Sequence, residues 1–455
     1  MSGGNKRKKK KENKEERRKM VMAFVCLFLV FLLFAGFLIK IGVDKALYNR
    51  FEDRGLPRIN IELNGVSLDE IKNGLKETKY KDNELVLYND GRVDEFRNVE
   101  VKGRGNSTWK NAKKPFQIGF KNKVDLLKLG KAKKWVLLAS RADYSLLRND
   151  AALKLAEILE IKYSHRGEFV ELYIDGVYEG LYYILQKINI AKTSVDLREI
   201  GGVLFELDNV YVDRENEEYY ESKLGNTLVL KDIKPDNEKD KKIIVDDFLN
   251  DFNSLEVAAQ KGDYEKVAEI INVQSFAKYY LISEFTVNPD AYSTSFYLYK
   301  DGMNGKIQAG PVWDFDLALG NHNWAWEVDE RFYSPSEDMI RKREAFGEDG
   351  LTENKYISKI MYYLMEIPDF REEVKQVFQE KMSGKVGELI KAMQDKKSEI
   401  QIAMIENSEK WKINDSEKEI EYLLDWVTRR YKHFEFEYGN NDIDWINDRK
   451  YSQSL

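Results

Sequence analysis

The stretch GPVWDFDLALG, residues 310–320, carries two aspartates, Asp314 and Asp316, inside an otherwise apolar run. If this segment is a strand or the end of one, side chains two residues apart lie on the same face. Two like charges on one side of an apolar segment raise the free energy of the fold unless a partner compensates them. A metal ion, an arginine and solvent are the three candidate partners, and the choice depends on which groups the rest of the chain brings to this stretch.

A third aspartate, Asp290, lies in the segment NPDAY, 24 residues before Asp314. The residues between them include FYLYKDGMNGKIQAGPVW, which reads as a hairpin, and a hairpin brings the ends of its two strands together. On its own, Asp290 also fits the end of a helix or a turn, where aspartate is common. A convergence of the three carboxylates without histidine favours a hard cation such as Mg²⁺ as the partner.

A glycine-bearing segment upstream is a candidate anion site. In KGRGNSTWK, residues 102–110, glycines stand on both sides of an arginine and small polar residues follow. Glycines let backbone N–H groups approach an anion, and Asn, Ser and Thr side chains add donors. The next segment, KKPFQIGF at residues 113–120, reads as a strand with a lysine that could point at a phosphate. A polar hairpin turn and an exposed lysine pair are the alternatives for these two segments.

Strand-like alternation and Asp-Gly turns mark residues 57–200, with one helical segment that starts near Ser145. Residues 201–440 have helical periodicity, interrupted by the β-like hairpin before Asp314. The pattern predicts an α+β chain with a β-rich N-lobe and a helical C-lobe. The candidate parts follow the order found in a kinase-like phosphotransferase: a glycine-bearing turn, a strand lysine, a loop aspartate and then a metal aspartate. The usual kinase motifs G-x-G-x-x-G, H-R-D and D-F-G are missing from the sequence.

The N-terminus is basic and then apolar. Residues 6–19 carry ten basic and three acidic residues, a net charge of +7, and residues 21–39 are uncharged and mostly apolar. An apolar run of this length can cross a bilayer, and the positive charge favours a cytosolic tail. We therefore predict a tail at 1–19, a transmembrane helix at 20–42, a linker at 43–56, an extracytoplasmic body and a C-terminal tail at 441–455. A cleaved signal peptide is the alternative.

The composition excludes several kinds of site. The chain has a net charge of −6, so the part after the +7 tail carries −6 − 7 = −13, which argues against nucleic-acid binding. The one cysteine, Cys26, excludes an intramolecular disulfide and a cysteine-based zinc site. Three scattered histidines argue against a histidine-ligated metal and a histidine-based triad. No pattern indicates an oligomeric state.

Four groups of motifs together resemble the CotH kinase family, named for the bacterial spore-coat protein H. They are GRGNSTW with KKPFQIGF, WVLLASRADYSLLRN, ELYIDGVYEGLYYILQKI, and NPDAY paired with GPVWDFDLALGN. The resemblance covers roughly residues 57–440. It implies an atypical, two-lobed protein-kinase-like fold, here preceded by one transmembrane helix, and some members of the family phosphorylate spore-coat proteins.

The resemblance also implies roles for single residues. Lys114 would be the catalytic lysine that contacts phosphate, with Lys113 as its substitute. Asp290 would orient or deprotonate the acceptor hydroxyl, and Asp314 would hold Mg²⁺ with Asp316 as second ligand or support. The loop that covers the nucleotide would consist of Gly103, Arg104, Gly105, Asn106, Ser107 and Thr108.

Three further motif residues qualify these roles. Ser295 stands where many members have an asparagine five residues after the catalytic aspartate, and a hydroxyl is a poorer metal ligand than an amide oxygen. Gln186 stands where many members have a glutamate near the nucleotide, so a neutral amide would weaken that contact. Arg148 lies inside a motif, and we expect it to be buried or to face phosphate.

Three functions are consistent with the sequence. The leading hypothesis is a membrane-anchored phosphotransferase that uses ATP and Mg²⁺, or Mn²⁺, and phosphorylates Ser/Thr hydroxyls of a cell-envelope or spore-coat protein. The second is a surface-displayed binding or structural module that keeps the fold without the activity, because ATP is scarce outside cells. The third is a glycosidase that uses Asp290 with Asp314 or Asp316 as acid and base, which would leave the glycine-rich turn without a role.

Overall fold

The computed structural model describes residues 17, 19–36, 38, 55–213, 215–234, 238–321 and 357–439. The predicted C-terminal tail lies outside the described residues, as do most of the cytosolic tail and the linker. One described helix, Lys19–Gly36, is long and apolar enough to cross a membrane, and a signal sequence would have the same properties. The side on which the body lies therefore stays a prediction.

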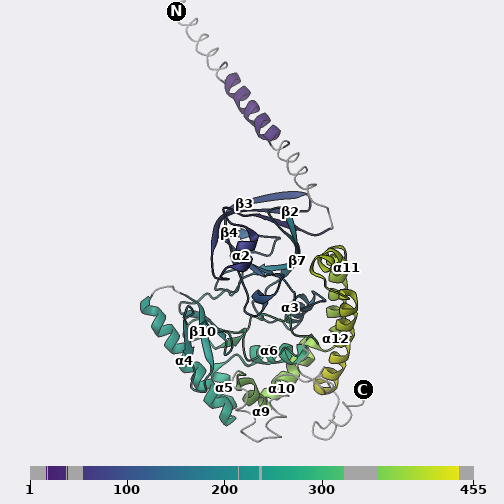
Figure 1. Ribbon diagram of the computed structural model, residues 1–455. Helices are drawn as coiled ribbons and strands as arrows, with labels where there is room; N and C mark the ends of the chain where they lie inside the picture. Colours follow the sequence, from purple (N-terminus) through teal and green to yellow (C-terminus); the bar gives the residue numbers. More distant parts are fainter. Residues whose placement is uncertain are drawn as a thin grey trace, which may run out of the picture.

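The described body is a mixture of strands and helices, as the sequence predicts (Figure 1). The strands are β1 Arg58–Glu62, β2 Tyr80–Asn89, β3 Arg92–Gly103, β4 Phe116–Asp125, β5 Lys131–Leu138, β6 Gly167–Ile174, β7 Val177–Gln186, β8 Gly202–Leu207, β9 Tyr219–Glu221, β10 Thr227–Lys234, β11 Phe296–Lys300 and β12 Gln308–Ala309. The helices are α2 Leu68–Asn73, α3 Arg148–Ile158, α4 Glu238–Lys261, α5 Tyr264–Ile270, α6 Val273–Thr286, α9 Ile360–Glu366, α10 Pro368–Val377, α11 Val386–Trp411 and α12 Ser416–Tyr438. Two short helical turns are η1 Thr108–Lys110 and η3 Phe378–Met382.

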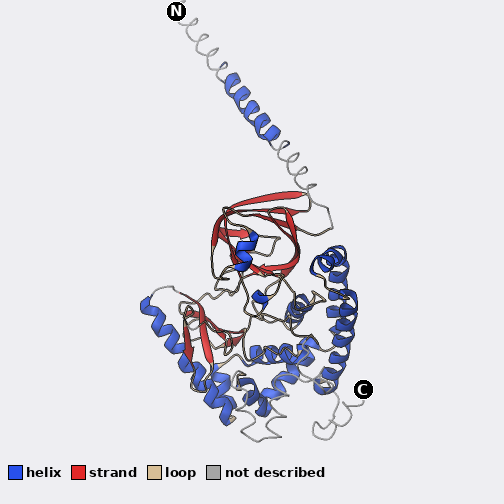
Figure 2. Ribbon diagram, viewed as in Figure 1, coloured by secondary structure: helices blue, strands red, loops and turns tan. Residues whose placement is uncertain are grey.

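Seven strands form a closed barrel in the order β1-β2-β3-β4-β5-β7-β6, seen as the ring of red strands in Figure 2. Tight Asp-Gly turns join β2 to β3 and β6 to β7. Asp90 and Gly91 have φ of 48° and 70°, and Asp175 and Gly176 have φ of 50° and 75°. These left-handed angles suit a two-residue hairpin turn, so the predicted turns are confirmed. Alternating apolar residues, among them Ile59 of β1, fill the barrel interior.

The barrel corrects the predicted two-lobed kinase arrangement, because the β-rich half is a closed ring and not an open lobe. Strand β1 pairs antiparallel with β2 on one side and parallel with β6 on the other, with Ile59 opposite Leu172. That parallel pair closes the sheet. Its two strands lie more than a hundred residues apart in sequence, so local alternation identifies both strands but not their pairing.

A second sheet lies within the region predicted to be mainly helical, in the order β12-β11-β8-β10-β9. Its central strand β8, GVLFEL, is buried at every position, so it lacks the alternation that marks a half-exposed strand. The predicted hairpin before Asp314 supplies β11 and β12. The helical description of residues 201–440 is therefore only partly correct.

The helices surround the second sheet and one side of the barrel. Helix α4 lies along the second sheet, and α11 and α12 pair along the opposite side of the molecule (Figure 1). Helix α3, predicted from Ser145 onward, packs on the outer face of the barrel, where the Tyr183 hydroxyl donates to Asp150 at 2.9 Å. One large core joins α3, the second sheet and these helices. The region between the barrel and the second sheet holds the candidate site.

Candidate functional site

Asp290 lies in a loop that directly follows helix α6. The helix ends at Val287, which has a left-handed φ of 48°, and the chain then turns through Asn288. The Asn288 side chain accepts from the Asp290 backbone N–H at 3.1 Å and donates to the Asp314 carbonyl at 3.3 Å. One asparagine thus ties the two aspartate segments together, and the structure brings Asp290 and Asp314 to one place, as the hairpin argument predicts.

The WDFD stretch is a loop after β12 and not a strand. Asp314 has a φ of 68°, and the next N–H, of Phe315, donates to the Asn149 side chain of α3 at 2.9 Å. The carbonyl of Asp316 accepts from Asn321 at 2.6 Å. The side chains of Asp314 and Asp316 nevertheless contact each other through a hydrogen bond. The loop, and not strand alternation, turns both carboxylates to the same side.

Burial and like charge dominate the electrostatics of this cluster. Burial, with the Asp314 and Asp208 carboxylates, raises the pKa of Asp290 to about 7. Burial and the neighbouring carboxylates of Asp314, Asp143 and Asp290 hold the pKa of Asp316 well above its usual range. Burial also raises the pKa of Asp314, against the opposing effect of Arg104. Without a cation, burial and the repulsion between the carboxylates therefore favour the protonated form within this hydrogen-bonded pair.

Arg104 faces the carboxylates from the glycine-bearing turn after β3. Its guanidinium lies over the Trp313 ring at 4.8 Å from the centroid, and Asp314 is among the charges that raise its pKa against burial. Gly105 has a φ of 84°, and a Cβ there would lie 2.0 Å from Thr108 Oγ1, so the turn requires glycine. Arg104 therefore offsets part of the charge of Asp314, while Asp290 and Asp316 keep the cluster predominantly acidic.

The rest of the turn reaches the same region. The Ser107 side chain hydrogen-bonds to Tyr211, and the carboxylates of Asp290 and Asp314 raise the pKa of that tyrosine after burial does. Lys76 Nζ holds the turn from behind, donating to Asn106 Oδ1 at 2.8 Å and to the Gly105 carbonyl at 3.1 Å. At Gly103 a Cβ would lie 2.6 Å from the Trp109 ring. Thr108 begins the short helical turn η1.

A cationic group that sequence reasoning missed lies beside Arg104. Burial and the nearby charges of Arg104, Lys134, Lys231 and Lys102 lower the pKa of Lys187 to about 8. The group follows β7 directly, within the motif LQKI. The feature of the sequence that could have identified Lys187 is its position at the end of a long apolar run. A lysine at such a position places its ammonium group where the strand leaves the barrel.

The second sheet contributes two further groups that the sequence did not single out. Glu206 of β8 is 8% exposed and pairs with Lys231 of β10 at 2.8 Å. Asp208, directly after β8, accepts from the N–H groups of Val210 and Tyr211. Glu206 lies near the end of the fully buried strand β8, and Asp208 follows that strand. Only the pairing of β8 with β10 and β11 brings the two acidic residues to the site.

The two lysines predicted to contact phosphate make other contacts. Lys113 is fully buried, its Nζ donates to the Leu181 carbonyl at 2.5 Å, and its ammonium lies over the Tyr182 ring at 4.6 Å. Lys114 Nζ donates to the carbonyl of Trp109 at 2.5 Å and lies over that ring. No described contact joins either ammonium to the aspartates, so the predicted lysine role has no geometric support at these positions.

Three other predicted residues are placed as follows. Arg148 was expected to be buried or to face phosphate, and it is fully buried. It pairs with Asp143 and Glu419 at 2.6 Å each. Gln186 points away from the aspartates and donates to the Leu129 carbonyl at 2.7 Å. Ser295 is buried just before β11 with a φ of 55°.

The carboxylates fit a magnesium ion that is shared with a ligand. Within the described parts of the chain, no group of three or more His, Cys, Asp or Glu residues is arranged as a complete metal site. Mg²⁺ typically keeps several waters and takes one or two carboxylates plus phosphate oxygens, so it does not need such a group. The raised pKa of Asp314 and of Asp316 marks where a cation would relieve the repulsion between two buried carboxylates. These two residues would hold the ion.

Comparison with protein families identifies the family of the chain. The family model described as CotH kinase protein matches residues 101–434 of the 455-residue chain. The matched region begins in β3, just before the glycine-bearing turn, and ends in α12. It therefore includes every site residue described above apart from Lys76. No curated protein matches the chain.

Proposed function

The chain belongs to the CotH kinase family, and we propose that it is a magnesium-dependent phosphotransferase that moves the terminal phosphoryl group of ATP to a protein hydroxyl. The observation that carries this proposal is the meeting of Asp290 with the Asp314–Asp316 pair, opposite Arg104 on the glycine-bearing turn. Phosphoryl transfer depends mostly on positioning and charge neutralisation, so a site with acidic and cationic sides matches its needs.

Asp290 has the properties of the residue that faces the acceptor. Its pKa of about 7 lets it take a proton near neutral pH, which is where a general base works best. No hydrogen bond from a described residue reaches its carboxylate, while its backbone is fixed by Asn288 and by the N–H groups of Ser293 and Thr294. A fixed backbone with an open carboxylate suits an acceptor Ser or Thr hydroxyl.

The opposite side of the site suits the phosphates. Arg104 and Lys187 would bind phosphate oxygens, and Ser107 with the backbone of its turn would cover them. A magnesium ion held by Asp314 and Asp316 would supply charge neutralisation of the transferred group. We propose Lys187 for the lysine role first assigned to Lys114, because Lys187 lies beside Arg104 whereas Lys114 would first have to leave the Trp109 carbonyl.

The acceptor and the location are further parts of the proposal. The acceptor that we propose is a protein of the spore coat or cell envelope, as the resemblance to the CotH kinase family implies. The apolar helix at Lys19–Gly36 supports attachment to a membrane with the body outside the cytosol. In that location the donor supply would limit the reaction, and a binding module without activity is the alternative that the experiment below distinguishes.

The test uses the full chain in detergent with labelled ATP, Mg²⁺ or Mn²⁺, and a panel of Ser/Thr-rich proteins. Asp314→Asn should abolish metal-dependent nucleotide binding. Asp290→Asn should leave binding within about threefold and reduce transfer by about 10²–10⁴-fold, the usual contribution of a general base. The exposed Asp94→Asn on β3 is the matched control and should change neither. If the wild-type chain binds no nucleotide with either metal, the phosphotransferase proposal is wrong and the binding module replaces it.

A further inference from the structure

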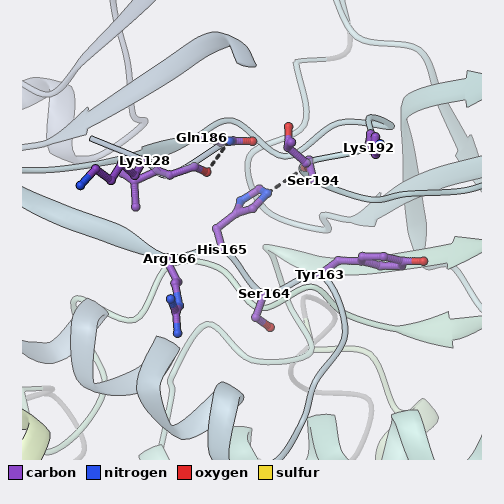
Figure 3. A pocket seen from close by; sticks show the side chains of 10 residues that line it. Lys128, Tyr163, Ser164, His165, Arg166, Gln186, Lys192 and Ser194 are labelled. Carbon is purple, nitrogen blue, oxygen red and sulfur yellow. Dashed lines mark hydrogen bonds between the residues drawn. The ribbon is translucent and has the colours of Figure 1, made fainter. Parts of the chain in front are cut away.

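A separate pocket of about 270 Å³ lies at the end of β7 and is lined by none of the carboxylates of the candidate site. Figure 3 shows His165 at its centre, with Ser194 on one side and Lys128 on another. Its walls come from three loops, before β5, before β6 and after β7. None of the predicted site residues except Gln186 lines it.

The pocket is basic although the chain is acidic. Lys128, Arg166 and Lys192 line it, and its described lining includes no Asp or Glu. No described carboxylate lies within ion-pair distance of Lys128 or Lys192, while Arg166 is 79% exposed and 3.7 Å from Glu157. Two cations without an ion-pair partner among the described residues, with the largely exposed Arg166 beside them, attract an anion to this concave surface although the chain has a net charge of −6.

Buried polar atoms in the pocket lack a protein partner. His165 is 8% exposed, its Nε2 contacts Ser194 Oγ at 2.8 Å, and its Nδ1 is buried without a hydrogen bond. The Oγ of Ser164 is also buried without one. Such groups raise the free energy of the fold unless a water or ligand bonds to them. A ligand in this pocket would satisfy His165 Nδ1.

The hydrogen bonds around His165 indicate how it would meet an anion. Ser194 Oγ accepts from the Asn189 N–H at 3.3 Å, so its own proton is available to His165 Nε2. The imidazole then carries its proton on Nδ1, which becomes a donor inside the pocket. A neutral donor at the centre and cations at the rim is the pattern of an oxyanion site.

We propose that this pocket binds phosphate, either as the free ion or as a small phosphate monoester, with His165 Nδ1 at the centre and Lys128 and Lys192 at the rim. The volume is below the usual range for drug-sized ligands, which restricts the ligand to this size. The site is independent of the proposed transfer reaction, because its residues lie outside the carboxylate cluster. Gln186, which lines this pocket, is next to Lys187 on the chain.

The experiment measures binding of inorganic phosphate and of glycerol 3-phosphate to the full chain in detergent by calorimetry, at constant ionic strength with chloride as the balancing anion. Preference for one probe identifies the source of the phosphate group. The double variant K128A/K192A should weaken binding at least about tenfold, because it removes two charge-assisted contacts. K121A/K123A on β4 removes the same net charge from exposed positions outside the pocket and should have no effect.

Two substitutions at the centre separate a built site from general surface charge. Glutamine places its amide near the Nε2 position, so His165→Gln keeps the Ser194 contact and loses the Nδ1 donor, and it should weaken phosphate binding. Asparagine places its amide near Nδ1, so His165→Asn should retain more of the binding. Melting temperatures of both variants check that each one folds.

Four results would overturn the proposal. The first three are the absence of saturable phosphate binding by the wild-type chain, equal losses in K128A/K192A and K121A/K123A, and equal binding by the two His165 variants. A loss of binding in Lys187→Ala with full binding in K128A/K192A would also overturn it, because that result assigns the phosphate to the carboxylate site.

Discussion

Asp290→Asn should stabilise the metal-free protein while removing its activity. The carboxylate is partly buried beside Asp314 and Asp208, and its pKa rises from 3.8 to about 7. A raised acid pKa means that the folded state binds a proton more tightly than the unfolded chain does. The stabilisation of the folded state by this proton is fully present below pH 4 and is lost as the pH rises to about 7. Asparagine does not ionise and so avoids this loss.

The expected magnitude follows from the shift. A difference of about 3 pH units corresponds to about 4 kcal/mol at 1.36 kcal/mol per unit. Partial solvent access to Asp290 reduces this, so we expect Asp290→Asn to be more stable by about 2–4 kcal/mol at pH 8. The difference should shrink steadily as the pH falls and be close to zero at pH 4. Mg²⁺ with nucleotide should also reduce it, because a cation stabilises the ionised form.

The assay is urea denaturation of the full chain in detergent with a metal chelator, at pH 4, 6 and 8. Asp94→Asn, on an exposed part of β3, is the control and should match the wild type throughout. A variant that is no more stable than the wild type at pH 8 would refute the reasoning. So would a gain in stability of the same size at all three pH values, because it would point to packing and not to ionisation.

Other predictions concern the turn, a buried ion pair, the metal and the membrane. Gly105→Ala should destabilise the chain by about 1–3 kcal/mol and weaken nucleotide binding, because φ is 84° and the new Cβ would meet Thr108 Oγ1; thermal melts with and without nucleotide check this. Arg148→Met should cost about 3–5 kcal/mol by leaving Asp143 buried without its partner, and adding Asp143→Asn should recover part of the loss in urea denaturation. Binding of Mg²⁺ with ATP should tighten as the pH rises, because burial raises the pKa of Asp314 and of Asp316 and these two carboxyls must release protons before they hold the ion; titrations in two buffers of different ionisation enthalpy measure the released protons. Protease added to intact cells should degrade the body, and full protection of the body would reverse the predicted orientation.

Some features of this protein could be read from the sequence because they depend on neighbouring residues. The Asp-Gly turns at Asp90 and Asp175 form as predicted, since left-handed backbone angles are a local property of those residues. The apolar run at the N-terminus gives the helix Lys19–Gly36 for the same reason. The motifs around Arg104 and Asp314 identify the family, and the family model confirms it. The pairing of Asp290 with Asp314 followed from the hairpin between them.

Other features depend on residues that are distant in sequence, and only the tertiary structure decided them. The parallel pair of β1 with β6 closes the barrel, and neither strand carries a signal for the other. The sequence alone does not distinguish Lys114 from Lys187 as the lysine of the site. In the structure Lys114, just before β4, donates to the Trp109 carbonyl, while Lys187, just after β7, lies near Arg104. The pocket around His165 combines three loops in the same way. Alternation and turn residues specify local conformation, whereas strand pairing and the direction of a long side chain are set by packing across the whole chain.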